Sequence, residues 1–161
     1  MAALVYQYPI NHLVRGLKFK GNLAAGQLLA DEMAATSPRF ESSRPDLILP
    51  VPLHYTRRLK RGFNQAEFLA RQMSRSEALP LETRILRRVK RTSAQSGLSR
   101  KERKINIKGA FACKPLKGLK IVLVDDVLTT GTTLNECCRA VKIAGAVSVA
   151  VWVAARVPPK S

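Results

Sequence analysis

Apolar residues recur at helical spacing in four separate parts of the chain. In the opening stretch, "YPINHLVRGLKFKGN", the apolar positions lie three or four residues apart: Ile10, Leu13, Val14 and Leu17. The next stretch, "LAAGQLLADEMAA", predicts a second helix with Asn22 as its cap, and "NQAEFLARQM" predicts a third that begins at Asn64. A fourth helix is expected over residues 133–144, ending at Gly145.

Between these stretches lie apolar runs that predict strands. They are "DLILPVP" from Asp46, "TRILRRV" from Thr83, "IVLVDDV" from Ile121 and "AVSVAVWVAA" from Ala146. The run from Ile121 does not alternate between apolar and polar residues, which is typical of a strand buried on both faces of a parallel sheet. Strands alternate with helices, so we expect an α/β fold with a mostly parallel sheet flanked by helices, in a single domain over residues 1–161.

The charge balance points to an anionic partner. The 161 residues contain 28 Lys and Arg against 11 Asp and Glu, a net charge of +17, and residues 57–108 hold 16 basic and 4 acidic residues. Such a surface suits nucleic acid, a phosphorylated small molecule or an acidic protein. The composition alone leaves these three classes open.

Cysteine usage and apolar content limit the setting. Cys113, Cys137 and Cys138 show no metal-ligand spacing, and three cysteines do not form a disulfide framework. The first 15 residues show no signal-peptide pattern, so we expect a cytoplasmic protein. The longest apolar stretch, "AGAVSVAVWVAA" from Ala144, is too short to cross a bilayer as a helix, so no membrane association is expected.

The stretch "IVLVDDVLTTGTT", residues 121–133, places two acids and a hydroxyl-rich loop after a buried strand. Ligands of open α/β sheets bind beyond the carboxyl ends of strands. Consecutive strand residues point to opposite faces, so at least one of Asp125 and Asp126 must reach this edge. The loop contains Gly131 and opens a helix, an arrangement that suits phosphate, while carboxylates accept hydrogen bonds from vicinal sugar hydroxyls. The pattern favours a ribose 5-phosphate; the alternative is an exposed Asp-Asp turn with a Thr-rich cap.

The same stretch resembles the signature with which type I phosphoribosyltransferases bind phosphoribosyl pyrophosphate (PRPP). The resemblance implies that Asp125 and Asp126 hold the ribose hydroxyls and that the loop holds the 5-phosphate. The implied PRPP-binding residues are Val124, Asp125, Asp126, Thr129, Thr130, Gly131, Thr132 and Thr133. It also implies Mg²⁺ as a cofactor, held mostly through the substrate with Asp125 and Asp126 as candidate ligands. The implied fold is the type I phosphoribosyltransferase fold, with a small hood built from the N-terminal residues.

A basic loop, "PVPLHYTRRLKRGFNQAEF" from Pro50, lies between another strand and helix. Arginine pairs with phosphate bidentately, so this is the candidate pyrophosphate loop; the alternative is a solvated basic loop. Its candidate residues are Pro52, Leu53, Arg57, Arg61 and Gly62. This string and the opening "LVRGLKFKGN" are similar to the ComF/GntX family, competence- and carbon-utilisation-associated proteins related to phosphoribosyltransferases.

The segment 90–108 is long, basic and without apolar periodicity. It matches a later pattern of the same family, and its candidate flexible-loop residues are Arg91, Thr92, Gln95 and Arg103. Three interpretations stay open: a flap that closes over PRPP and excludes water, a contact surface for nucleic-acid phosphates, or a solvated loop.

The resemblance implies a reaction in which pyrophosphate is displaced from PRPP, with Asp125, Asp126, Arg57 and Arg61 as catalytic candidates. The acceptor cannot be read from the sequence, and neither can a general base or the oligomeric state. Family members commonly carry a four-Cys zinc-binding segment ahead of this domain; it is absent here, so we expect no zinc. Two rival functions remain. One is a non-catalytic nucleotide-sensing or DNA-handling module with competence helicase and recombination proteins as partners, and the other is an RNA-binding regulator.

Overall fold

The centre of the molecule is a four-stranded sheet in which every strand is parallel to its neighbours. The computed structural model describes residues 1–37, 44–53, 59, 62–90 and 105–158. The strand order is β1-β6-β5-β2, from β1 (Ala2–Val5), β6 (Ser148–Arg156), β5 (Lys120–Leu128) and β2 (Leu47–Pro50). A β2 register that pairs Pro50 with Val124 places the carboxyl ends of β2 and β5 side by side.

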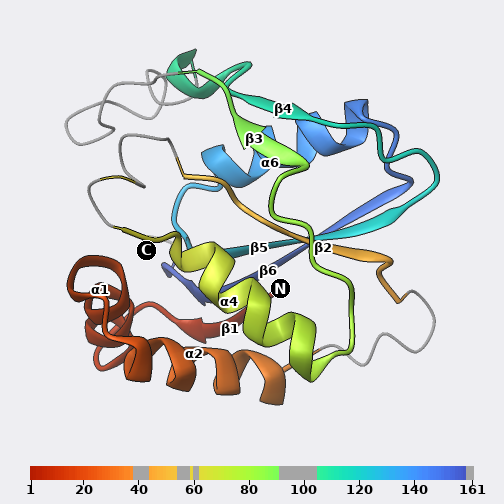
Figure 1. Ribbon diagram of the computed structural model, residues 1–161. Coiled ribbons are helices and arrows are strands. Elements are labelled where there is room, and N and C mark those ends of the chain that lie inside the picture. The colour runs from red at the N-terminus through yellow and green to blue at the C-terminus, as the bar shows by residue number, and fades with distance from the viewer. Residues whose placement is uncertain (38–43, 54–58, 60–61, 91–104, 159–161) are drawn as a thin grey trace.

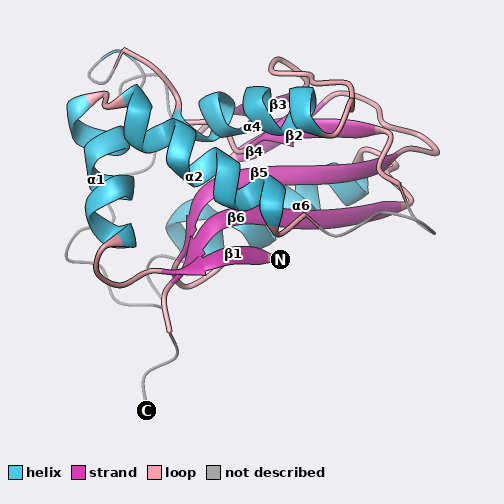
Figure 2. Ribbon diagram, turned by 90° about the horizontal axis from the view of Figure 1, so that it is seen from below, coloured by secondary structure: helices cyan, strands magenta, loops and turns pink. Residues whose placement is uncertain are grey.

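Helices cover both faces of this sheet (Figure 1). One face packs against α2 (Leu23–Ala35) and α4 (Gln65–Ser76), and the other packs against α6 (Thr132–Ile143). A two-stranded antiparallel sheet of β3 (Leu86–Arg88) and β4 (Phe111–Cys113) lies beside α6. The remaining helix, α1 (Ile10–Lys20), lies at the end of the sheet toward which the strands run (Figure 2).

The alternation of β5 explains why two cores form. Val122 and Val124 belong to the apolar cluster of α1, α2 and α4, whereas Ile121 and Leu123 belong to the cluster of α6, β3 and β4. All four side chains are almost fully buried, because a parallel strand between two helical layers has no solvent face. The uninterrupted apolar run in the sequence is therefore a consequence of the three-layer architecture.

Local sequence signals fix the helix ends. The Asn22 side chain accepts a hydrogen bond from Ala25 N at 3.0 Å, and the Asn64 side chain accepts one from Ala66 N at 3.1 Å. Gly21 ends α1 in the left-handed conformation, at φ 62°. The helix expected over 133–144 spans Thr132–Ile143, and the one expected from Asn64 to Met73 runs three residues further, to Ser76. All four predicted helices are confirmed.

The N-terminal residues form more of the fold than the small hood that was expected of them. They supply the edge strand β1, parallel to β6, and the helix α2 that packs on the sheet, so only α1 overhangs the carboxyl ends of the strands. The run from Thr83 does form a strand, but β3 pairs with β4 and stays outside the parallel sheet. Both β1 and β4 were missed from sequence, because runs of four and three residues are too short to show a period.

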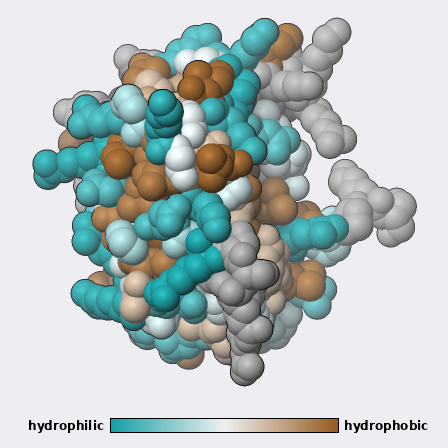
Figure 3. Space-filling view, turned by 90° about the vertical axis from the view of Figure 1, so that its right-hand side faces the viewer, coloured by the Kyte–Doolittle hydropathy of each residue, from teal (hydrophilic) through white to brown (hydrophobic). Residues whose placement is uncertain are grey.

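The opposite end of the molecule, where the strands begin, mixes polar and apolar side chains on its surface (Figure 3). Ile143, the last residue of α6, and Val147, just before β6, are 71% and 58% exposed. None of the helices in the described ranges is long and apolar enough to cross a membrane.

Candidate functional site

The predicted site lies where β2 and β5 end. Val51 N donates to Val124 O at 2.9 Å, which extends the β2–β5 ladder one residue beyond β2. The Asn64 side chain then donates to Val51 O at 3.0 Å, which fixes the first turn of α4 against the same edge. The two segments that the sequence assigned to ribose phosphate and pyrophosphate are therefore neighbours at one edge of the sheet.

The two acids of this edge have different surroundings. Asp126, 8% exposed, accepts a hydrogen bond from Lys18 Nζ at Oδ2 (2.9 Å) and one from Val127 N at Oδ1 (2.9 Å). Asp125 is partly exposed and accepts a hydrogen bond from Asp126 N at Oδ1 (2.9 Å). Among the described residues, no N–H group donates to the second oxygen of Asp125, and the Asp126 carboxyl lies close enough to hydrogen-bond with the Asp125 carboxyl. Asp125 is thus the acid with an oxygen left for a ligand.

Electrostatics separates the acids further. Burial raises the pKa of Asp125 well above its ordinary value, and the neighbouring Asp126 charge raises it further. The backbone N–H of Asp126 and the charge of Lys18 act in the opposite direction. Burial also raises the pKa of the Cys137 thiol on α6, and the Asp125 charge is the next largest cause. Cys137, on α6, is fully buried and packs in the apolar core as an apolar residue does.

The hydroxyl-rich loop forms a small cavity at the start of α6. The cavity has a volume of about 50 Å³ and is lined by Asp125 and residues 127–134. Gly131 has φ 72°, in the left-handed region, and the helix begins at Thr132, so N–H groups of the first turn face this loop. The Thr130 and Thr132 hydroxyls lie 2.9 Å apart. A cavity of this size, with a helix N-terminus and an acid at its rim, suits one phosphate group with a hydroxylated substituent.

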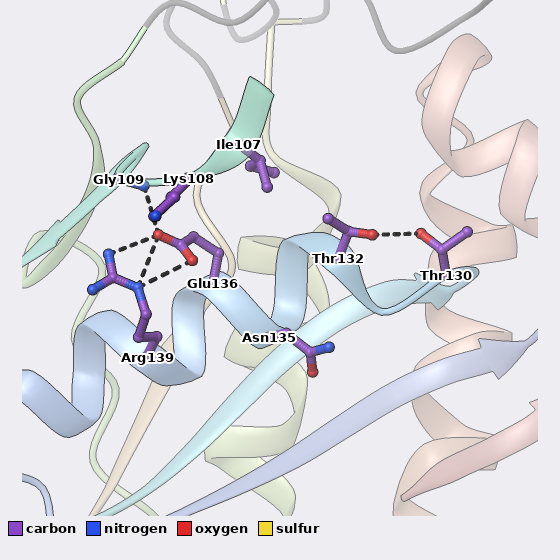
Figure 4. Close-up of a pocket in the computed structure, with 8 residues that line it drawn as sticks. All are labelled: Ile107, Lys108, Gly109, Thr130, Thr132, Asn135, Glu136 and Arg139. Carbon is purple, nitrogen blue, oxygen red and sulfur yellow. Dashed lines mark hydrogen bonds and ion pairs between the residues drawn. The ribbon is translucent and has the colours of Figure 1, made fainter. Parts of the chain in front are cut away.

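A larger cavity of about 870 Å³ shares Thr130 and Thr132 with the loop (Figure 4). Its wall is the side of α6 that faces the turn before β4, and its charged residues are Lys108, Glu136 and Arg139. Glu136 accepts a hydrogen bond from Gly109 N at 2.6 Å and pairs with Arg139 at 2.7 Å. Hydrogen bonding to Arg139 is the main cause that lowers the pKa of Glu136.

Sequence reasoning missed the roles of Lys18 and Glu136. Lys18 contacts an acid 108 positions away, and Glu136 contacts a backbone group 27 positions away. No local pattern in the sequence marks either contact.

The structure does not test the roles predicted for several site residues. Arg57, Arg61, Arg91, Thr92, Gln95 and Arg103 lie outside the described residues. Of the pyrophosphate-loop candidates, Pro52 and Leu53 are half-buried directly after β2, and Gly62 is exposed with φ 79° shortly before α4. The roles assigned to all of these residues stay predictions.

The donor set at this edge is compatible with Mg²⁺ bound mainly through a ligand. Within the described ranges, no three His, Cys, Asp or Glu side chains come together as a metal cage. Mg²⁺ in phosphate sites keeps several waters and takes one or two protein carboxylates plus phosphate oxygens. The second oxygen of Asp125 fits that requirement, whereas Asp126 is already paired with Lys18.

Comparison with known proteins assigns the family. A sequence model of the phosphoribosyl transferase domain matches residues 45–160. The chain belongs to this family. It is 36% identical over 159 residues to Competence protein F of Haemophilus influenzae, covering 94% of this chain and 69% of that protein. It is also 36% identical over 152 residues to the DNA utilization protein YhgH of Salmonella typhimurium, covering 91% of this chain and 67% of that protein. These relatives confirm the resemblance to the ComF group.

Solved structures confirm the fold. The purine phosphoribosyltransferase of Pyrococcus horikoshii superposes with a TM-score of 0.51 at 19% identity, covering 81% of this chain and 84% of that one. At this level of identity the likeness carries the architecture alone. The phosphoribosyltransferase domain therefore has the expected type I fold, and its ligand must be argued from the site.

Proposed function

We propose that this phosphoribosyltransferase domain binds PRPP, or another ribose 5-phosphate ligand, together with Mg²⁺. The observation that carries the proposal is that Asp125 lines the same small cavity as the Thr129–Thr133 loop. A phosphate at the loop would place a ribose within reach of the acid, and Asp125 has an oxygen to which no N–H group donates among the described residues. A sugar hydroxyl is a suitable donor to that oxygen.

The reaction that this arrangement supports is displacement of pyrophosphate from the anomeric carbon of PRPP by an acceptor. In that reaction the loop and the N–H groups of α6 hold the 5-phosphate, and Asp125 orients the ribose ring by its hydroxyls. Its negative charge also favours the positive charge that develops on the ring as pyrophosphate leaves. Bound Mg²⁺ would neutralise the pyrophosphate, and Arg57 and Arg61 are the predicted contacts for the same group. The chain's part is positioning and charge stabilisation.

The names of the relatives suggest the biological setting. Competence protein F and the DNA utilization protein YhgH align with more than nine tenths of this chain. We extend the proposal to a cytoplasmic role in the uptake or use of DNA, in which the phosphoribosyl ligand is part of nucleotide metabolism.

Titration calorimetry of PRPP, with and without Mg²⁺, tests the proposal. The wild type should bind with an affinity that depends on Mg²⁺, and the Asp125→Asn and Asp126→Asn double variant should lose that binding. The Asp31→Asn and Glu32→Gln double variant is the matched control, because both residues are exposed on α2 and the change removes two acidic charges. Absence of PRPP binding in the wild type would overturn the proposal.

A second candidate function is binding of nucleic acid by the basic surface, without transfer chemistry. Exposed basic residues gather around the β3–β4 hairpin: Arg84, Arg87, Lys90, Lys108 and Lys114. DNA or RNA bound there should dissociate steeply as salt rises and should be retained by Asp125→Asn. If neither DNA nor RNA binds at low salt, this candidate is excluded. Competence helicase and recombination proteins, as partners that this protein would meet on DNA, are then excluded with it.

A further inference from the structure

The ion pair between Lys18 and Asp126 joins the overhanging helix to the acidic edge of the sheet. Lys18 Nζ lies 2.9 Å from Asp126 Oδ2, and the side chains are 30% and 11% exposed. The two residues come from the last turn of α1 and from β5, 108 positions apart. A contact this shielded from solvent is screened less than a surface pair, so its geometry constrains both partners.

The backbone of Lys18 is fixed as well. Gln65, the first residue of α4 and 2% exposed, donates from its side chain to Lys18 O at 3.3 Å. Asn64, the residue before Gln65, donates from its side chain to Val51 O, and this hydrogen bond holds the start of α4 against the end of β2. Lys18 is thus positioned from two sides, by α4 through its carbonyl and by β5 through its ammonium group.

The pair changes what the two acids can do. With Lys18 on one oxygen and Val127 N on the other, both oxygens of Asp126 are occupied and its charge is offset. Asp125 is adjacent, and among the described residues the N–H group that donates to its carboxylate is Asp126 N, at Oδ1. Without Lys18, each of the two acids would present an oxygen that no protein N–H group contacts, and Asp126 would compete with Asp125 for the same sugar hydroxyl.

We propose that Lys18 is a positioning residue of the ribose site: it holds and neutralises Asp126, and so leaves the Asp125 carboxylate to accept the hydroxyl groups of the sugar. The inference rests on the proposed function, since it concerns how the same edge recognises ribose. Lys18 acts through the acids and not on the 5-phosphate. The phosphate loop lies on residues 129–133, and the cavity there is lined by Asp125 and not by Lys18.

The test uses two sugar phosphates that differ by one hydroxyl. Ribose 5-phosphate, 2-deoxyribose 5-phosphate and inorganic phosphate are titrated into the full chain by calorimetry. The variants are Lys18→Met, Lys18→Arg and Lys20→Met. Lys20 lies on the same helix and is exposed, so Lys20→Met controls for the loss of one positive charge. Thermal unfolding of each variant checks that the fold is intact.

We expect the wild type to prefer ribose 5-phosphate by roughly tenfold, the size of one hydrogen bond to a charged acceptor. In Lys18→Met the preference should fall to within about twofold, while the affinity for inorganic phosphate stays that of Lys20→Met. Lys18→Arg should restore most of the preference, because arginine keeps the ion pair. A residue with only a structural role would weaken all three ligands together and leave the ratio unchanged.

The outcomes separate the two proposals. If wild type and Lys18→Met show the same preference, the role of Lys18 is overturned and the ribose site stands. Equal losses for both sugars and for inorganic phosphate in Lys18→Met also overturn it. If the wild type binds neither sugar phosphate, the proposed function and this inference both fall.

Discussion

Glu136 and Gly109 connect two parts of the molecule that bear on the site. The Glu136 carboxylate, from the first turns of α6, accepts a hydrogen bond from Gly109 N at 2.6 Å (Figure 4). Gly109 lies just past the segment 90–108 that the sequence assigned to a flap, and α6 starts at the phosphate loop. One carboxylate therefore joins the base of the predicted flap to the helix that carries the loop.

This contact predicts a pH-dependent loss of stability in Glu136→Gln. The pKa of Glu136 is lowered by hydrogen bonding to Arg139 and, to a smaller extent, by Gly109 N, with burial acting against both. A lowered carboxyl pKa contributes stability that is present above the unfolded value of about 4.3 and is lost as pH falls through the folded value. At pH 7 the variant should lose about 1 kcal/mol, or roughly 2–4 °C in Tm for a chain of this size.

Calorimetric or circular-dichroism melting between pH 3 and pH 8 measures the difference. Glu32→Gln serves as the control, because Glu32 is exposed on α2. The gap between wild type and Glu136→Gln should close in acid, and a gap of constant size across this range contradicts the assignment.

The conformation of Gly131 predicts a specific loss of phosphate binding in Gly131→Ala. Gly131 has φ 72°, and a Cβ there would meet Leu128 Cδ1 at 3.5 Å and Asn135 Nδ2 at 3.7 Å, which are ordinary contacts. The cost is therefore backbone strain in the left-handed region, of about 1 kcal/mol, and its relief would distort the loop.

Gly118→Ala is a matched control for this strain. Gly118 has φ 82° with no atom within 4 Å of the added Cβ, and it lies just before β5, at the opposite end of that strand from the loop. Both variants should lose similar stability in thermal melts, but only Gly131→Ala should weaken inorganic phosphate binding in calorimetry. Equal phosphate affinities in the two variants would show that the loop does not hold the anion.

The sequence predicted those parts of the site that are contiguous in the chain. Asp125, Asp126 and the loop through Thr133 could be found because strand, acids and helix start follow one another without interruption. The basic loop and the acids each follow a predicted strand, so both were expected at the carboxyl ends of parallel strands. That β2 and β5 pair directly is a finding of the structure. The four helices were found from their apolar spacing and their Asn and Gly ends, since these signals are local.

Contacts between distant segments could not be predicted in this way. Lys18 and Asp126 meet only because α1 folds over the end of β5. Nothing in the sequence distinguishes Lys18 from the other basic residues near it. The unequal roles of the two acids depend on that contact, so the sequence presented them as equivalent. The edge strand β1 was missed for a different reason: "AALV" has no alternation, and its partner β6 is nearly 150 residues away.

Close packing beneath α1 predicts opposite effects for two glycine substitutions. At Gly26, on α2, an added Cβ would lie 2.7 Å from Phe68 Cε1 and 2.8 Å from Leu17 Cδ1. Gly26→Ala should therefore cost about 1–2 kcal/mol, because overpacking exceeds the gain in helix propensity. At Gly16, on α1, the nearest atoms would be 3.7 and 3.8 Å away, so Gly16→Ala should gain about 0.5–1 kcal/mol. Urea unfolding of the two variants beside the wild type measures both signs, and a stabilised Gly26→Ala would contradict the packing of α1, α2 and α4.

The electrostatics of the acid pair predicts that Asp125→Asn makes the protein more stable. Burial and the Asp126 charge raise the pKa of Asp125, so its ionised form costs stability at neutral pH. Asparagine keeps an oxygen for the hydrogen bond from Asp126 N and removes the charge. Asp126→Asn should act in the opposite direction, because it removes the partner of Lys18 and leaves that ammonium group without its ion pair.

The sign of the pH dependence follows from the raised pKa. The cost of ionised Asp125 is largest above its folded pKa, shrinks as pH falls through that value, and is absent below the unfolded value of about 3.9. The Tm of Asp125→Asn should thus exceed that of wild type by a few degrees at pH 7, and the two should converge toward pH 4. Asp31→Asn, an exposed change of the same charge, should show no such gap. If Asp125→Asn melts below the wild type at pH 7, the Asp125 carboxylate stabilises the fold, and the prediction is wrong. If the variant melts above the wild type and also loses PRPP binding, the charge of Asp125 lowers the stability of the fold and is needed by the ligand.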